Sequence, residues 1–407
     1  MLKKTKIVCT LGPASKDEKT MKAMLEAGMN VARLNFSHGT HEGHRKTIKT
    51  FRKVRDELGV PAAVLLDTKG PEIRVGDFEN GSEMLEAGDT FVLTSEKCMG
   101  TAQRADTTYK ALPTQVEAGT VILIDDGRIR MEVTDTTDTD VICRVISGGK
   151  ISNRKGVNIP NKSLDLEYIS EADRSDILFG IEMDVDYVAA SFVRSGDDVR
   201  ALRKLLNDNG GEKIKIISKI ENTEGIANFA EILDLSDGIM VARGDMGVEV
   251  DFEKLPGIQK KFIKECCRAG KPVITATQML ESMTTSTSPT RAEITDVANA
   301  VFDGTSAVML SGESAAGMFP VETVQAMAKI VHQAEIDAEE VNQYKFLEVE
   351  SDEKDIANAI GHAACTTAKD IKAKAIIAVT TSGYTAEMMS KYKPVDKIIA
   401  ATPVEKT

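Results

Sequence analysis

The stretch from Lys215 to Asp245, KIISKIENTEGIANFAEILDLSDGIMVARGD, decides the fold. It contains two short apolar runs, Lys215–Ile220 and Gly238–Ala242, with a segment of helical periodicity between them. Neither run alternates apolar and polar residues, which is typical of parallel strands buried on both faces. The stretch therefore predicts one strand–helix–strand unit of a parallel sheet.

The same pattern recurs along the chain and predicts a closed (β/α)₈ barrel, because eight such units are the number that closes one. Two helix starts are expected, one at Ser288-Pro289 and one at the capping box Ser170-x-x-Asp173. The apolar runs are Lys6–Thr10, Asn30–Asn35, Ala62–Asp67, Tyr187–Phe192, Lys215–Ile220, Gly238–Ala242, Pro272–Ala276 and Ala307–Leu310.

One interval interrupts the alternation of strands and helices. From about Glu72 to Pro160 no convincing helical pattern occurs, and the runs Thr120–Ile124 and Arg128–Val133 alternate as half-buried strands do. Asp126-Gly127 between them is a hairpin signal. We therefore expect an all-β insertion after the third strand, with limits at residues 71 and 168, placed to act as a lid on the catalytic face.

The chain after the eighth unit changes in character. A helix–strand–helix–strand pattern follows, with strands near Ala375–Thr380 and Lys397–Ala401. Two strands do not make an independent α/β sheet. We expect an incomplete C-terminal α/β domain over residues 344–407, after barrel parts at residues 1–70 and 169–343. Its start is an acidic linker that contains Glu348, Glu350, Asp352 and Glu353.

The composition excludes several classes of function. A net charge of -12 argues against nucleic acid and anionic membranes as partners, so any anionic ligand must be held by local cations. The six cysteines form no C-x-x-C pair. No apolar segment is long enough for a signal peptide or a membrane span. We therefore expect a cytoplasmic protein with free thiols.

Polar residues gather where the predicted strands end, which is where a (β/α)₈ barrel carries its chemistry. A lone carboxylate at such a place is more often a helix cap than a ligand. Six of the eight ends carry such groups, however, so the set as a whole indicates a site. The six segments are Arg33–Gly39, Asp67–Arg74, Ser218–Asn222, Arg243–Asp245, Thr277-Gln278 and Ser311–Glu313.

Two carboxylates among these residues suit a magnesium ion. Glu221 and Asp245 follow adjacent strands, and Mg²⁺ is usually bound by one or two carboxylates together with water and substrate oxygens. Lys219 projects to the same side of the chain as Glu221, because it lies two residues before Glu221 in an extended segment. A cation beside a metal suits phosphoryl transfer. Gly244 would let backbone N–H groups approach an anion at the start of the next helix.

At these residues the sequence resembles the pyruvate kinase family, from Lys6 to about Ala338. The resemblance implies a (β/α)₈ barrel with a β-barrel lid after strand three and a C-terminal α/β domain. It also implies transfer of the phosphoryl group of phosphoenolpyruvate to ADP, giving ATP and pyruvate in the last step of glycolysis. The matching stretches are Asn30–Gly39, Leu66–Arg74, Lys155–Pro160, Ile217–Asn222, Met240–Glu249, Thr275–Met283, Pro289–Ala292 and Val308–Ser314.

The resemblance implies bound magnesium and potassium. Glu221 and Asp245 resemble the ligands of the protein-bound Mg²⁺, and a second Mg²⁺ would arrive with the nucleotide. Thr68 would contribute its backbone carbonyl to potassium. The full potassium set would be Asn35, Ser37, Asp67 and Thr68.

The resemblance also implies roles in binding and catalysis. Lys219 is similar to the residue that stabilises the phosphoryl group in flight, and Arg33 to the one that holds the substrate phosphate. The substrate carboxylate would be held by backbone groups of Gly244 and Asp245 and by the hydroxyl of Thr277. Proton transfer to the enolate would involve Thr277 and Ser311. The nucleotide-side positions would be Arg33, Asn35, His38, Arg74 and Lys155.

A loop near the C-terminus resembles an effector site. It ends a strand and opens a helix, which suits a bound phosphate, although a plain strand-to-helix turn is the alternative. In the family the corresponding loop holds a phosphate of an allosteric sugar phosphate. The family's subunit contacts use this domain, so the resemblance implies a homotetramer. The loop residues are Thr380, Thr381, Ser382, Gly383 and Thr385.

Two glutamates near the predicted site leave alternatives open. Family members with glutamate at the place of Glu72 need a monovalent cation, and those with lysine tend not to. The alternative is that Glu72 only pairs with Arg74 or Lys69. Glu313 has no chemical role that the sequence reveals, and we expect it to support the strand-eight loop.

Two other functions compete with this prediction. One is a magnesium-dependent aldolase or lyase barrel that acts on pyruvate enolate, since such barrels also pair two carboxylates around a metal. The potassium cluster, Lys219 and the β insertion argue against it. The other is a non-catalytic sensor, which the intact set of site residues argues against.

Overall fold

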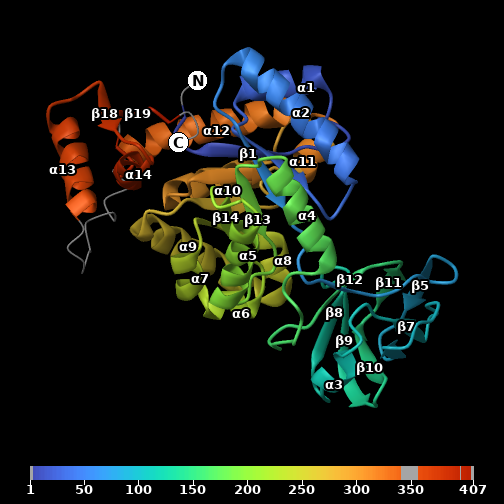
Figure 1. Cartoon of the computed structure of the whole chain (residues 1–407). Coiled ribbons are helices and arrows are strands. Elements are labelled where there is room, and N and C mark those ends of the chain that lie inside the picture. Colours follow the sequence, from blue (N-terminus) through green and yellow to red (C-terminus); the bar gives the residue numbers. More distant parts are fainter. Residues whose placement is uncertain (1–2, 341–355, 395, 405–407) are drawn as a thin grey trace.

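The computed structural model describes residues 3–340, 356–394 and 396–404. It consists of a barrel, a β insertion and a small C-terminal region, which Figure 1 shows in sequence colours. The predicted acidic linker lies outside the described residues.

Eight parallel strands close into a barrel in the order β1-β17-β16-β15-β14-β13-β3-β2. Each predicted apolar run coincides with one of them, although four runs extend one or two residues beyond the strand. The predicted (β/α)₈ fold class is thereby confirmed. The strands are β1 (Lys6–Thr10), β2 (Val31–Asn35), β3 (Ala63–Asp67), β13 (Tyr187–Ala190), β14 (Lys215–Ile220), β15 (Gly238–Ala242), β16 (Val273–Ala276) and β17 (Ala307–Leu310).

Apolar side chains cover both faces of the barrel strands. Val8 belongs to a cluster to which nearly every strand contributes, whereas its neighbours Ile7 and Cys9 belong to the larger cluster packed with the helices. Alternate strand residues point into and out of a barrel. The small cluster is therefore the barrel interior, and the large one lies between strands and helices.

The helices that follow the strands surround the barrel. None of the described helices is long and apolar enough to cross a membrane. The helices are α1 (Glu18–Ala27), α2 (His41–Leu58), α4 (Glu171–Glu182), α5 (Gly196–Asp208), α6 (Thr223–Ala227), α7 (Phe229–Leu235), α8 (Arg243–Glu249), α9 (Leu255–Ala269), α10 (Arg291–Asp303), α11 (Gly312–Ala315) and α12 (Pro320–Glu340), with 3-10 turns at Phe252–Lys254 and Glu281–Thr284.

One of the two predicted helix starts is correct and the other is wrong. Ser170 is the N-cap of α4, and its hydroxyl accepts from the Asp173 N–H. Helix α10, however, begins after Thr290 and not at Ser288-Pro289. Thr290 and Glu293 form a complete capping box, which satisfies two backbone N–H groups, whereas a lone serine cap satisfies one.

The β insertion has a sheet and a core of its own. The predicted hairpin is confirmed, since β8 and β9 pair antiparallel with Ile124 opposite Ile129. A short helix, α3 (Leu112–Gln115), occurs where no helix was expected. The larger sheet has the order β4-β12-β8-β9-β10-β6-β7, and β11 pairs with β5. The strands are β4 (Ile73–Arg74), β5 (Ser82–Leu85), β6 (Thr90–Thr94), β7 (Arg104–Asp106), β8 (Val121–Ile124), β9 (Ile129–Thr136), β10 (Asp140–Ser147), β11 (Gly149–Ser152) and β12 (Gly156–Asn158).

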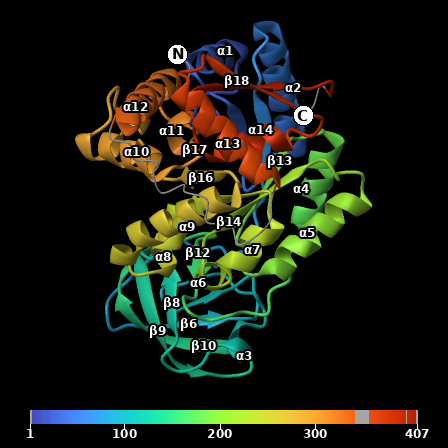
Figure 2. The ribbon, with the colours of Figure 1, turned by 90° about the vertical axis from the view of Figure 1, so that its left-hand side faces the viewer.

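The insertion lies beyond one end of the barrel. Figures 1 and 2, which differ by a quarter turn, both place it next to α6 and α8. These helices begin directly after Asn222 and Ala242, at the ends of β14 and β15. The insertion therefore faces the carboxyl ends of the strands, where the site is predicted.

The C-terminal region forms a small α/β unit on the other side of the barrel (Figure 1). Both predicted strands are confirmed, and they pair in parallel with Ala375 opposite Lys397. Lys393 joins the unit to the barrel by donating to the carbonyls of Gly304 and Thr305. The elements are α13 (Ile356–Asp370), β18 (Ala375–Val379), α14 (Tyr384–Lys391) and β19 (Lys397–Ala401).

Candidate active site at the barrel mouth

A buried cluster of charges lies where β2, β3 and β14 end. The Asp67 carboxylate accepts from Arg33 Nε at 2.6 Å and from Lys219 Nζ at 3.1 Å. The Lys219 ammonium also pairs with Glu221 Oε1 at 2.9 Å. All four residues are buried. Buried charges are stable only when paired, so these side chains hold one another in fixed positions.

The cluster shifts the pKa values of its members. Burial alone would raise the pKa of Asp67, but the charges of Arg33 and Lys219 outweigh burial and hold it below its ordinary value. Burial raises the pKa of Glu221 to about 7, an effect that Lys219 opposes and Asp245 strengthens. Lys219 keeps its proton, because Asp67 and Glu221 raise its pKa against the effect of burial.

Ser191 is at the centre of this cluster, and sequence reasoning missed it. Its hydroxyl accepts from Lys219 Nζ at 2.7 Å, and it lies 3.1 Å from Asp67 Oδ1 and 2.6 Å from the Thr68 carbonyl oxygen. It directly follows β13, one of the two strand ends that were not counted as polar. The signal was present, because a serine at a strand end of a barrel points to the same face as the other site residues.

Glu221 and Asp245 fit a divalent cation. Glu221 Oε2 accepts from the Phe192 N–H at 2.6 Å, which orients the carboxylate. Asp245 is half-buried in the first turn of α8, and no described residue donates a hydrogen bond to its side chain. Among the described residues no group of three or more His, Cys, Asp or Glu could hold a metal. Two carboxylates completed by substrate oxygens is the arrangement that Mg²⁺ commonly takes.

The four predicted potassium ligands lie on two neighbouring strand ends. Asn35 is opposite Asp67 in the parallel pairing of β2 and β3. Asn35 Oδ1 accepts from the Ser37 N–H at 3.0 Å, and the Thr68 carbonyl faces Ser191. The set offers several oxygens and one negative charge, which suits a weakly held monovalent cation.

A second group of predicted residues meets at the ends of β15, β16 and β17. The Gly244 N–H donates to Thr277 Oγ1 at 2.7 Å, so two of the three residues expected to bind the substrate carboxylate are in contact. Glu313 supports the Ser311 loop, as expected, because its Oε2 accepts from the Ser311 N–H at 2.7 Å. Arg243, for which no role was predicted, contacts the carbonyls of the Thr277 segment.

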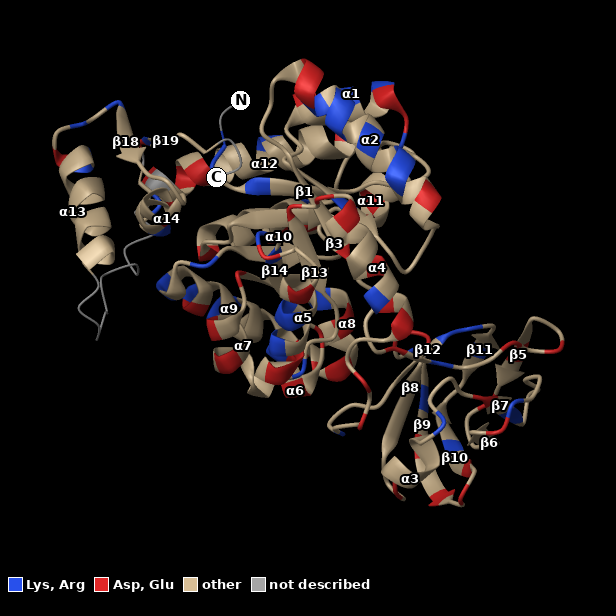
Figure 3. Cartoon of the chain, in the orientation of Figure 1, with Lys and Arg blue, Asp and Glu red and all other residues tan. Residues whose placement is uncertain are grey.

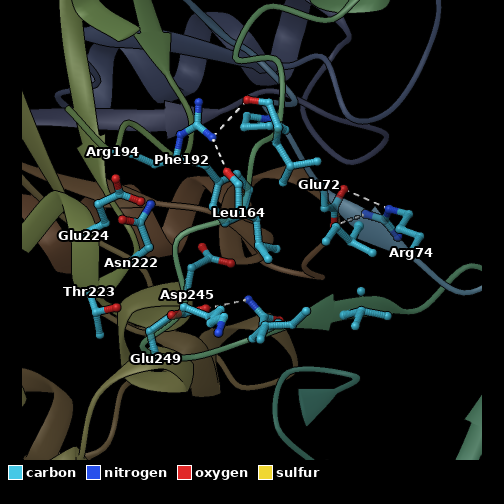
Figure 4. A pocket seen from close by; sticks show the side chains of 18 of the residues that line it. Glu72, Arg74, Leu164, Phe192, Arg194, Asn222, Thr223, Glu224, Asp245 and Glu249 are labelled. Carbon is cyan, nitrogen blue, oxygen red and sulfur yellow. Dashed lines mark hydrogen bonds and ion pairs between the residues drawn. The ribbon is translucent and has the colours of Figure 1, made fainter. Parts of the chain in front are cut away.

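A cavity of about 280 Å³ lies between the barrel mouth and the β insertion. Figure 4 shows Glu72 and Arg74 on one side of it, Asn222, Thr223 and Glu224 on the other, and Asp245 between them. Lys155, also in the lining, pairs with Asp125 at 2.7 Å. Barrel and insertion thus build this cavity together.

The predicted nucleotide-side residues are divided between two places. Arg74 and Lys155 line the cavity from the insertion, whereas Asn35 and the exposed His38 belong to the β2 end and are not among its lining residues. Glu72 and Arg74 form an ion pair at 2.6 Å, so the pairing considered for Glu72 is present.

The predicted effector loop lies in the C-terminal unit. The Gly383 N–H donates to Thr380 Oγ1 at 3.0 Å, and Gly383 is the N-cap of α14. Charges of both signs are interspersed over the helices and the insertion (Figure 3).

Comparisons with known proteins decide the family. The chain matches the family model for the pyruvate kinase barrel domain over residues 2–324 and that for the pyruvate kinase alpha/beta domain over residues 358–407. The chain belongs to the pyruvate kinase family. Its members are phosphotransferases, so the predicted enzyme class is confirmed together with the family.

Individual pyruvate kinases are similar over the whole chain. A pyruvate kinase of Clostridium acetobutylicum is 49% identical over 408 residues, covering 100% of the chain and 86% of the relative. One of Staphylococcus haemolyticus is 49% identical over 411 residues, covering 100% and 70%. The crystal structure of a pyruvate kinase from Cryptosporidium parvum has a TM-score of 0.95 at 42% identity, covering 99% of this chain and 84% of the other.

Proposed function

We propose that this chain transfers the phosphoryl group of phosphoenolpyruvate to ADP, giving ATP and pyruvate in glycolysis. The observation that carries the proposal is the buried Lys219 ammonium, held 3.1 Å from Asp67 and 2.9 Å from Glu221. A preorganised, buried cation at the barrel mouth is suited to the charge that develops during phosphoryl transfer.

The substrate would be held by groups around this ammonium. Arg33 binds the phosphate, and its Nε–H bond to Asp67 fixes the direction of its guanidinium. The N–H groups of Gly244 and Asp245 bind the carboxylate together with the Thr277 hydroxyl, which already contacts Gly244. Lys219 then interacts most strongly with the phosphoryl group as it moves, because its charge is fixed before the reaction begins.

Two kinds of metal ion fit the residues present. A magnesium ion held by Glu221 and Asp245 would offset negative charge on the phosphoryl and enolate oxygens. A potassium ion would be held by Asn35, Ser37, Asp67 and the Thr68 carbonyl. A second magnesium would enter with the nucleotide.

The nucleotide would enter through the cavity under the β insertion. Arg74 and Lys155 supply cations from that side, while Asn35 and His38 approach from the β2 end. After transfer, Thr277 and Ser311 belong to the region that relays a proton to the methylene carbon of the enolate, which completes pyruvate.

Several further features belong to the same proposal. Six unpaired thiols support a cytoplasmic enzyme. We propose domain limits at residues 70, 168 and 343, and assembly as a homotetramer. The strand-to-helix loop of the C-terminal unit would hold a phosphate of a sugar-phosphate effector through Thr380, Thr381, Ser382, Gly383 and Thr385.

A coupled assay tests the function. Pyruvate formed from phosphoenolpyruvate is reduced by lactate dehydrogenase, and the rate is measured with and without ADP and with and without potassium. The proposal expects turnover that requires ADP and rises with potassium. Pyruvate formation that is independent of ADP would instead indicate a lyase, and no pyruvate at all would indicate a non-catalytic relative.

A further inference from the structure

The segment that follows β16 has a conformation that its residues do not prefer. Thr277 has a φ of 70° and Gln278 a φ of 53°. A β-branched residue such as threonine rarely adopts positive φ, and such residues persist only where their surroundings hold them. Something outside the segment must therefore stabilise it.

Arg243 contacts this segment from the end of β15. Its Nη2 donates to the Thr277 carbonyl at 2.6 Å and to the Gln278 carbonyl at 3.2 Å, and its Nε reaches the Ala276 carbonyl at 3.3 Å. Nη1 is paired with the Asp296 carboxylate of α10 at 2.8 and 2.9 Å. The guanidinium is buried, so this fork of donors is fixed on three consecutive carbonyls.

Glu313 contacts the same segment from the first turn after β17. Its Oε1 accepts from the Leu280 N–H at 3.2 Å, and its Oε2 accepts from the Ser311 N–H at 2.7 Å. The residue is fully buried. One carboxylate therefore ties the segment after β16 to the end of β17.

The position of the Thr277 hydroxyl follows from these contacts. The backbone at Thr277 is held through its own carbonyl, and its Oγ1 accepts from the Gly244 N–H at 2.7 Å. A displacement of about 1 Å of a positioning group costs about 10²-fold in rate. Small shifts of this segment would therefore reach the reacting centre.

We propose that Arg243 and Glu313 are positioning residues that clamp the segment after β16 from two sides and place Thr277 and Ser311 for catalysis. The inference rests on the proposed function of Thr277. Neither residue touches the substrate in this account. Both act through the backbone of the segment between them.

Arg243→Lys tests the clamp, because lysine keeps the positive charge but has no planar set of N–H donors that can reach several carbonyls at once. The matched control is Arg203→Lys at the other end of the barrel, where Arg203 also donates to a carbonyl, that of Ile214, and pairs with Asp237. We expect Arg243→Lys to lower kcat by about 10²-fold, with cooperative thermal unfolding retained. Arg203→Lys is expected to leave kcat unchanged. Equal kcat for both variants would overturn the proposal.

A double-mutant cycle with Thr277→Val separates the clamp from general structural support. If Arg243 acts through Thr277, adding Arg243→Lys to the Thr277→Val enzyme should lower kcat by less than about threefold. The effect is small because the substitutions of coupled residues are not additive. Glu313→Gln replaces one accepting oxygen with an NH2 group, so one of the two backbone N–H groups loses its acceptor. In the same cycle its loss should shrink but not vanish, because Glu313 also holds Ser311 directly. Losses that multiply in full in the Thr277→Val background would overturn the inference.

The cycle also distinguishes this inference from the proposed function. A Thr277→Val enzyme with wild-type kcat would refute the role of Thr277. A Thr277→Val enzyme with a reduced but measurable kcat, in which the loss from Arg243→Lys multiplies in full, would refute only the clamp. If Arg243→Lys does not fold, Asp296→Asn takes its place, since it weakens the ion pair that holds the guanidinium. The same two outcomes of the cycle then decide.

Discussion

The two ends of the barrel satisfy their polar groups in different ways. At the amino ends, residues that precede one strand accept from an N–H near the start of the neighbouring strand. Asp186 accepts from Val64 at 2.7 Å, and Asp237 accepts from Ile216 at 2.8 Å. Asn30 accepts from Ile7 at 3.0 Å, and Ser306 from Val273 at 3.2 Å, in the same manner.

The carboxyl ends follow no such regular pattern. Charged side chains are buried there against one another, as Lys219 is between Asp67 and Glu221. Phe192 and Thr277 have positive φ at this end. The amino ends serve stability, because side chains there repeatedly accept hydrogen bonds from backbone N–H groups. The carboxyl ends instead hold buried charges and strained backbone in place for chemistry. Substitutions at the two ends should therefore change different observables.

The largest effect is expected at Asp245. Asp245→Ala should abolish turnover at saturating magnesium, because one of the two proposed carboxylate ligands is lost. The fold should survive, since no described residue donates a hydrogen bond to that side chain. Steady-state rates across a magnesium titration, with thermal unfolding as the control, measure both. Wild-type activity in this variant would remove Asp245 from the site.

Lys219→Met should lower kcat by about 10²–10³-fold. The KM for phosphoenolpyruvate should change much less, because the fixed charge serves mainly the transition state. Initial rates over a range of phosphoenolpyruvate concentrations separate the two parameters. A raised KM with an unchanged kcat would show that Lys219 only binds the substrate.

At the amino end of the barrel, Asp237→Ala should lower the stability of the protein and leave kcat within about twofold of wild type. The buried Ile216 N–H loses its acceptor, and Arg203 loses its partner. Loss of such a bond costs about 1–3 kcal/mol in the free energy of unfolding. Chemical denaturation measures the free energy of unfolding. The matched control is Asp234→Ala at an exposed position, which should change that free energy by less than about 0.5 kcal/mol. A large loss of kcat in Asp237→Ala would erase the distinction between the two ends.

The smallest effect concerns potassium dependence and Glu72. The wild-type enzyme should be activated by potassium, and Glu72→Lys should keep substantial activity without it, because an ammonium replaces the charge of the ion. The observed pair with Arg74 supplies the alternative, in which two half-buried side chains only form an ion pair at the surface of the site, worth about 0–1 kcal/mol. Rates against potassium at constant ionic strength, with the exposed Glu79→Lys as control, decide between them. A variant as potassium-dependent as wild type would favour the alternative.

The sequence predicted most of the fold, because apolar runs and turn signals are local. The Asp126-Gly127 hairpin and all eight barrel strands are of this kind. The start of α10 was misplaced because two overlapping signals competed, and Glu293 decided for Thr290 through a reciprocal bond. The pattern Thr290-x-x-Glu293 is visible in the sequence, and it prevails because it satisfies two backbone N–H groups where a lone serine cap satisfies one.

The candidate site was predicted less completely. Strand ends brought the carboxylates and Lys219 to one place, as the barrel rule requires. The roles of Ser191 and Arg243 were not predicted, because they arise from contacts across strands. Ser191 contacts Lys219, and Arg243 contacts the backbone of Thr277. A strand-end position marks both residues as candidates, but their partners are distant in sequence, and only the structure shows those contacts.

The most direct test of the account is ³¹P NMR of the reaction catalysed by wild-type enzyme and by Lys219→Met at equal concentration. The account predicts that wild type converts the phosphoenolpyruvate signal into the γ-phosphate of ATP, while Lys219→Met leaves it almost unchanged over the same time. Inorganic phosphate in place of ATP, or equal conversion by both proteins, would contradict it.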